Sequence, residues 1–245
     1  MKALVPALFL FAVGAVAPAN LLVDPTGGTQ LSSSDDSGSF ETLSGFSFYG
    51  APVTSIYAST NGNLNTLFSN NQQPPITTPQ ISPLADDFVQ IAGTSSFSRL
   101  TTASAYSYTW KDDATFGAND SLWTFQATLV RANATIGGIA LLQNDIVFSY
   151  GRIGSAFRDD QALIGLSNGN IATANLAPGS DPTTGYINRA TAGSFFPTGE
   201  NYVRYRFNGT TYDRTIVGTS AVPEPATLAI LGAGAVALVR RRRRG

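Results

Sequence analysis

Apolar and polar residues alternate with a period of two along much of this chain. Tyr106, Tyr108 and Trp110 occur two residues apart, so a strand would place all three on one face. The stretches 122–130 and 146–150 repeat the alternation and are rich in Thr, Tyr, Phe and Val, which suit half-buried sheet surfaces. No window of this body sustains an apolar period of 3.6 over a typical helix length. The pattern predicts an all-β fold, an antiparallel β-sandwich-like single domain.

Two Asn-Gly pairs mark the hairpins that we expect. Asn61-Gly62 lies between the strand-like stretches 53–59 and 63–68. A type I′ turn suits this pair because both of its central residues need positive φ. Asn208-Gly209 follows the alternating stretch 202–207 and predicts a closing hairpin in the same way.

Three segments have a weaker pattern. Residues 20–40 are rich in Gly and Ser and predict a flexible lead-in, in which Leu21–Val23 would form an edge strand. Residues 171–198 are rich in Ala, Thr, Gly and Pro and predict a long irregular excursion. Arg204 and Arg206 share one face of the expected strand 202–207, where we expect them to be solvated.

Apolar stretches at the two ends predict export. Residues 1–19 combine a basic start, an apolar core and small residues near the end, which is typical of a secretory signal peptide cut between Ala19 and Asn20. The tail 219–245 contains an apolar run, 226–239, which predicts a short transmembrane helix. A basic stop-transfer cluster follows it and should stay cytoplasmic. That cluster consists of Arg240, Arg241, Arg242, Arg243 and Arg244. The extracellular domain would then be residues 20–218.

The order of blocks in the tail resembles the PEP-CTERM sorting tail of bacteria that make extracellular polysaccharide. The motif residues are Val222, Pro223, Glu224 and Pro225, followed by the apolar run and the arginines. The resemblance implies recognition by the membrane enzyme exosortase, with cleavage near Pro-Glu-Pro. It also implies delivery to the cell surface or extracellular matrix, with a C-terminal membrane anchor before processing. An ordinary short anchor with a basic stop is the alternative.

The body of the chain resembles the NIDO domain, the extracellular module first described in nidogen. The segments that carry this resemblance are Phe46–Gly50, Ser55–Tyr57, Asn61-Gly62, Ile81–Asp87, Trp123–Leu129, Ile146–Ile153 and Ala162–Gly169. They follow the family's order and cover about residues 46–169. Ala85 stands where the family usually has an aromatic residue, and Trp123 where Asn is common.

Composition narrows the chemistry that this chain can perform. The sequence has no Cys and no His, which excludes disulfides, thiol chemistry, zinc sites of the usual kind and Ser/His/Asp catalysis. Without Lys2, Glu224 and the five terminal arginines, nine of the 15 basic and 15 of the 16 acidic residues remain, a net charge of −6. A body this acidic lacks a nucleic-acid footprint.

Carboxylates are the remaining candidates for a site. Asp112, Asp113, Asn119 and Asp120 lie in a stretch that we expect to be a loop, and calcium accepts clustered carboxylate and amide oxygens. They are the predicted metal site, with solvated loops as the alternative, and no other cofactor is expected. Asp35-Asp36 in a Ser-rich loop would ordinarily be solvated. Asp86-Asp87 on a strand would point in opposite directions, which opposes a dyad that shares a proton.

Two functions from different classes fit these features. The first is a non-enzymatic protein of the surface or extracellular matrix, which acts in adhesion or associates with extracellular polysaccharide or a matrix protein. The alternative is a secreted glycoside hydrolase that cleaves matrix polysaccharide through paired aspartates, which would need two carboxyl groups about 5–9.5 Å apart across a cleft.

Overall fold

The computed structural model describes residues 20–32, 34–66, 77–193, 195–197 and 201–218. Within this part of the chain the fold is all-β, every strand pair is antiparallel, and the one α-helix, α1 (Arg189–Ala192), has a single turn. The fold class predicted from the alternating pattern is confirmed. Within the described residues, no helix is long and apolar enough to cross a membrane. The predicted signal peptide, transmembrane helix and sorting residues lie outside them.

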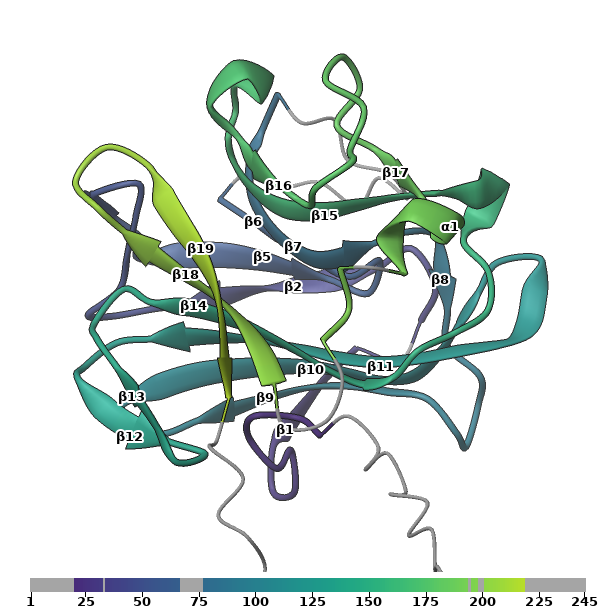
Figure 1. Cartoon of the computed structure of the whole chain (residues 1–245). Helices are drawn as coiled ribbons and strands as arrows, with labels where there is room; N and C mark the ends of the chain where they lie inside the picture. The colour runs from purple at the N-terminus through teal and green to yellow at the C-terminus, as the bar shows by residue number, and fades with distance from the viewer. Residues whose placement is uncertain (1–19, 33, 67–76, 194, 198–200, 219–245) are drawn as a thin grey trace, which may run out of the picture.

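Two sheets form the two layers of the domain (Figure 1). The first sheet has the order β1-β9-β10-β11-β14-β18-β19, with β8 also paired to β10. Its strands are β1 (Thr29–Ser32), β8 (Phe88–Val89), β9 (Ser96–Thr101), β10 (Ala105–Thr115), β11 (Ala118–Val130), β14 (Ile146–Arg152), β18 (Asn201–Phe207) and β19 (Tyr212–Gly218). The described part of β19 has no partner strand on its outer side.

The second sheet has the order β16-β15-β7-β6-β5-β2, with β17 also paired to β15. Its strands are β2 (Gly38–Thr42), β5 (Ser55–Ser59), β6 (Asn63–Asn65), β7 (Pro79–Ala85), β15 (Gln161–Asn168), β16 (Asn175–Leu176) and β17 (Ile187–Asn188). Two small hairpins complete the fold, β3 (Ser47–Phe48) with β4 (Ala51–Pro52) and β12 (Ala134–Ile136) with β13 (Ile139–Leu141).

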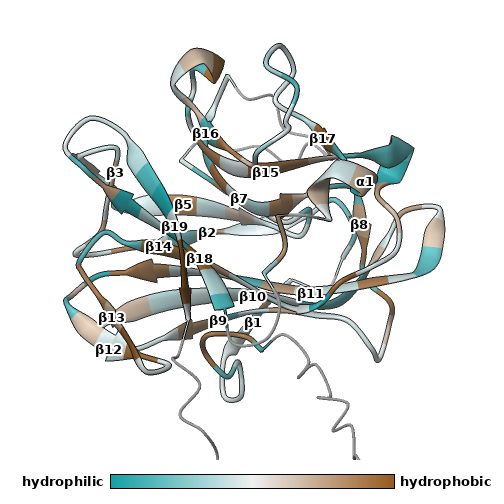
Figure 2. Ribbon diagram, viewed as in Figure 1, coloured by the Kyte–Doolittle hydropathy of each residue, from teal (hydrophilic) through white to brown (hydrophobic). Residues whose placement is uncertain are grey.

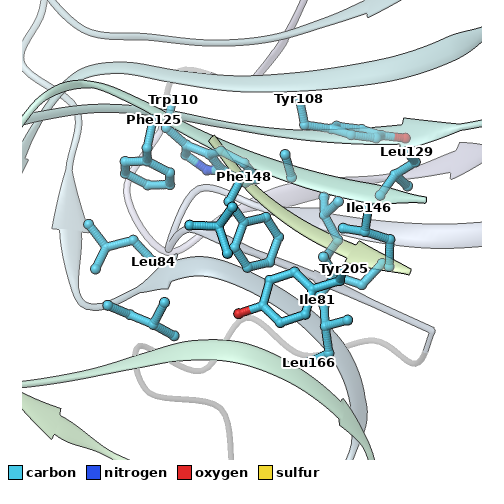
Figure 3. Packing of buried hydrophobic residues seen from close by; sticks show 14 of the residues in the cluster. Ile81, Leu84, Tyr108, Trp110, Phe125, Leu129, Ile146, Phe148, Leu166 and Tyr205 are labelled. Carbon is cyan, nitrogen blue, oxygen red and sulfur yellow. The ribbon is translucent and has the colours of Figure 1, made fainter. Parts of the chain in front are cut away.

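The core lies between the sheets and is rich in aromatic rings. Trp110 and Phe125 of the first sheet lie in one cluster with Ile81 and Leu84 of the second, and Tyr108 lies near Leu129 in the same cluster (Figure 3). The Trp110 ring stacks on Phe125 with centroids 5.1 Å apart, and its indole N–H donates to the Ser59 carbonyl at 2.9 Å. The period-two prediction for β10 and β11 is therefore confirmed at their core-facing positions. Figure 2 shows apolar residues along β14 of the first sheet and along β15 of the second.

The outer face of the first sheet carries a second, more polar layer. Gln126 donates to the Val23 carbonyl at 2.9 Å and accepts the Val23 N–H at 3.1 Å, while Ser149 accepts the Leu22 N–H. The side chain of Leu22 packs with Val147 and Tyr202. The predicted edge strand at Leu21–Val23 is wrong, because side chains of the sheet satisfy this backbone instead of a neighbouring strand. The lead-in also contains two strands, β1 and β2.

The Asn61-Gly62 hairpin is present, but its turn differs from the predicted type. Ser59 pairs with Asn63, so the loop has three residues, and φ is positive at Gly62 (77°) but not at Asn61. A three-residue loop that ends in a left-handed residue is a common hairpin form. A Cβ on Gly62 would lie 1.8 Å from the Leu84 carbonyl oxygen, so β7 leaves room only for glycine here.

The C-terminal third departs from the sequence-based expectation in two places. The excursion after β15 contains η2 (Ile171–Thr173), β16, β17 and α1, and both of its strands pair with β15. Arg206 is not simply solvated, because its guanidinium binds both carboxylate oxygens of buried Asp145 at 2.8 and 2.6 Å. Asn208-Gly209 does connect β18 to β19, as predicted.

Candidate functional site

A polar pocket of about 440 Å³ lies beside β17, at the edge of the second sheet. Its walls combine one half-buried aromatic ring, an aliphatic side chain, hydroxyls, amides and one carboxylate. The lining residues are Gln161, Gly179, Ser180, Asp181, Pro182, Thr184, Tyr186, Ile187 and Asn188. The size falls within the range of pockets that hold small ligands.

Backbone pairing and tight turns position these side chains. Asn188 pairs with Gln161 across β17 and β15, and its side-chain oxygen accepts the Thr191 N–H at 2.9 Å at the start of α1. The Asp181 N–H donates to the Tyr186 carbonyl at 2.8 Å and closes the loop between them. Tyr186 is thereby held at the wall of the pocket, and burial raises the pKa of its hydroxyl, which stays neutral at pH 7.

Asp181 is the only carboxylate among the residues that line this pocket. Its Oδ1 accepts the N–H groups of Thr184 and Thr183 at 2.8 and 2.7 Å, and these bonds lower its pKa. A carboxylate with a lowered pKa is a poor general acid near neutral pH. Such a pocket offers hydrogen bonds and a ring surface to a polar ligand, and it lacks the two opposed carboxyl groups of a glycosidase.

The predicted calcium residues lie near the hairpin that joins β10 to β11. Asp112 sits at a bulge in β10 with φ of 53° and faces Arg152 at 3.4 Å. Asn119 and Asp120 are exposed on β11, whereas Asp113 is fully buried. Within the described residues, the carboxylates of Asp112, Asp113 and Asp120 do not form a group whose oxygens all lie within 4.8 Å of one another. Calcium binding by this set stays a prediction.

Asp113 faces the interior beside Trp123 of the neighbouring strand. Burial raises its pKa well above the ordinary value and the Asp112 charge raises it further, while neither carboxyl oxygen has a hydrogen-bond partner among the described residues. No described basic side chain forms an ion pair with Asp113. The raised pKa favours the protonated form of its carboxyl group, which does not suit a calcium ligand.

Asp86 and Asp87 lie in the turn between β7 and β8, and they do not point apart as a regular strand would require. Asp86 accepts the Arg158 N–H at 3.0 Å and the Asp87 N–H at 2.8 Å, while the Asp87 carboxylate forms an ion pair with the Arg158 guanidinium. Burial raises the pKa of Asp86 to about 7, against the lowering effect of these two backbone hydrogen bonds. Both carboxylates therefore contact Arg158, Asp86 through its backbone N–H and Asp87 through its guanidinium.

The pocket residues were not identified from the sequence. The strongest local signal was Asp181-Pro182 within a Gly- and Thr-rich stretch, which predicts a turn and nothing more. Tyr186 becomes part of a wall only because β17 pairs with β15, a contact between segments about 25 residues apart that no local pattern reveals.

The tail follows directly after the last strand, since β19 ends at Gly218. Residues 221–244 match the family described as PEP-CTERM protein-sorting motif. The tail is a PEP-CTERM sorting motif. This motif implies exosortase-dependent sorting of an exported protein, with exosortase as the processing partner. Neither the curated proteins nor the solved structures gave a match to this chain.

Proposed function

We propose that this chain is a non-enzymatic protein of the bacterial surface or extracellular matrix, whose β domain associates with extracellular polysaccharide. The observation that carries the proposal is the PEP-CTERM motif at residues 221–244, which begins three residues after the last strand of an all-β domain. Exosortase would recognise Val222, Pro223, Glu224 and Pro225, with 226–239 and the arginines holding the tail in the membrane until processing. The resemblance to the NIDO domain supports an extracellular module.

The pocket beside β17 is the surface that we assign to the polysaccharide. Sugars present hydroxyl groups to hydrogen-bonding side chains and flat apolar faces to aromatic rings, and Tyr186 offers both a ring and a hydroxyl. Asn188 and Ser180 add an amide and a hydroxyl from two different segments. The lone, low-pKa Asp181 suits binding better than hydrolysis.

The sorting part of the proposal is tested by deleting residues 223–245 and fractionating cells that express the chain. We expect the truncated protein to be exported but not retained at the surface. The matched control replaces Arg240–Arg244 with lysines, which keeps the positive charge and should preserve sorting. Unchanged surface delivery of the truncated protein would contradict the proposal.

The binding part is tested by co-sedimentation of the full-length chain with purified exopolysaccharide from the same cells. Tyr186→Ala removes the ring from the pocket and should weaken binding about tenfold, in the range of one lost aromatic contact. Phe40→Ala is the control, because Phe40 is an exposed aromatic on β2, at the opposite edge of the same sheet. If Tyr186→Ala binds the polysaccharide as well as Phe40→Ala does, this pocket is not the binding site.

A further inference from the structure

Three aspartates from two distant segments meet beside the β7–β8 turn. Asp35 and Asp36 lie in the connection between β1 and β2, and Asp87 follows β7 about 50 residues later. One carboxylate oxygen of each lies within 4.8 Å of the other two. Asp36 also accepts a hydrogen bond from the Asn61 side chain at 2.8 Å. The Asn61 side-chain oxygen in turn accepts the Phe88 N–H at 2.9 Å, which ties the loop to the turn that carries Asp87.

Asp87 supplies an independent sign that this cluster is incomplete without a ligand. Its side chain is 1% exposed, and Oδ2 pairs with the Arg158 guanidinium. Its other oxygen, Oδ1, is buried and has no hydrogen-bond partner among the described residues. A buried carboxylate oxygen without a partner is costly, and a cation would satisfy it.

The local charge points in the same direction. Arg158 forms an ion pair with Asp87, and its guanidinium also lies 3.6 Å from the Asp159 carboxylate. The excess of negative charge remains after Arg158 is counted, and a divalent ion would neutralise it.

We propose that Asp35, Asp36 and Asp87 form a calcium site that fastens the β1–β2 connection to the β7–β8 turn. Calcium binds oxygen ligands at about 2.4 Å, so oxygens that lie within 4.8 Å of one another, as these do, can share one ion. Three carboxylates from irregular segments suit the flexible geometry of calcium better than the strict octahedron of magnesium. Water and backbone carbonyls would complete the coordination.

The test is calcium binding by the full-length chain, measured by isothermal titration calorimetry and by the shift of Tm between calcium and EDTA. We expect a dissociation constant of about 0.1–1 mM, as in other extracellular calcium modules, and a Tm that calcium raises. Asp35→Asn should weaken binding at least tenfold and remove most of the Tm shift. Asp35 is exposed, so this variant should fold.

The matched control is Asp120→Asn, which removes an exposed aspartate from the calcium set predicted by sequence alone. We expect it to bind calcium like the unmodified chain. Magnesium at the same concentration should give a much smaller Tm shift. No calcium-dependent heat or Tm shift up to 10 mM ion would overturn the proposal, and so would a loss of binding in Asp120→Asn but not in Asp35→Asn.

Discussion

Two pairs of adjacent aspartates in this domain have different surroundings. Asp86-Asp87 follows a strand of the second sheet and receives two backbone N–H groups and a guanidinium. Asp112-Asp113 occupies a bulge of the first sheet, where Asp112 turns outward to Arg152 and Asp113 turns inward without a cation. The sequences of the two pairs are alike, yet within the described residues only the first pair has an arginine in an ion pair with its buried carboxylate.

The difference comes from the side chain that a neighbouring segment places beside each pair. The turn before β15 places Arg158 against the first pair, and the hairpin partner β11 places Trp123 against Asp113. Burial without a nearby cation favours the protonated form of a carboxyl group. An arginine beside a buried carboxyl group favours the charged form, which is the form that binds an ion.

The largest effect on stability should come from removing the cation beside Asp86-Asp87, which makes this pair resemble Asp112-Asp113. Arg158→Met keeps the apolar stem and removes the charge, which leaves Asp87 buried and unpaired. We expect a loss of about 3 kcal/mol in the free energy of unfolding at pH 7 with EDTA present. Denaturation by urea measures it. The loss should shrink at pH 4, where Asp87 can take up a proton, and an equal loss at both pH values would contradict this account.

The second effect concerns the pH dependence that Asp113 imposes. Its pKa is raised in the folded state, so the stability that it contributes is complete below pH 3.8 and decreases as the pH rises toward the folded-state pKa. One such proton changes the free energy of unfolding by at most about 1.4 kcal/mol per pH unit. Asp113→Asn does not titrate, so its stability relative to the unmodified chain should increase from pH 4 upward. Parallel stability curves for the two proteins would show that Asp113 is ionised in the fold.

The smallest effect on stability should come from Arg152, the surface partner of Asp112. Arg152 is about half exposed, and its 3.4 Å contact with Asp112 is screened by water. Arg152→Met should change the free energy of unfolding by about 0.5 kcal/mol or less. The same urea experiment used for Arg158→Met measures it. A loss similar to that of Arg158→Met would remove the distinction between the two pairs.

Local patterns predicted the regular parts of this fold better than its sites. The alternation around Trp110 and the Asn208-Gly209 turn identified strands and a hairpin, because both signals act over a few residues. The turn type at Gly62 was not predicted, since the approach of the Leu84 carbonyl decides it. The meeting of Asp35 with Asp87 depends on sheet order, and no spacing in the sequence encodes it.

The last strand of the domain sets a limit on how the tail is processed. β19 is ordered into the first sheet up to Gly218, and four peptide steps then lead to Val222 at the sorting motif. A fully extended chain covers at most about 14 Å over that span. An enzyme that binds Pro-Glu-Pro in the folded protein must therefore accommodate a domain that is wider than this gap close to the bond that it cleaves.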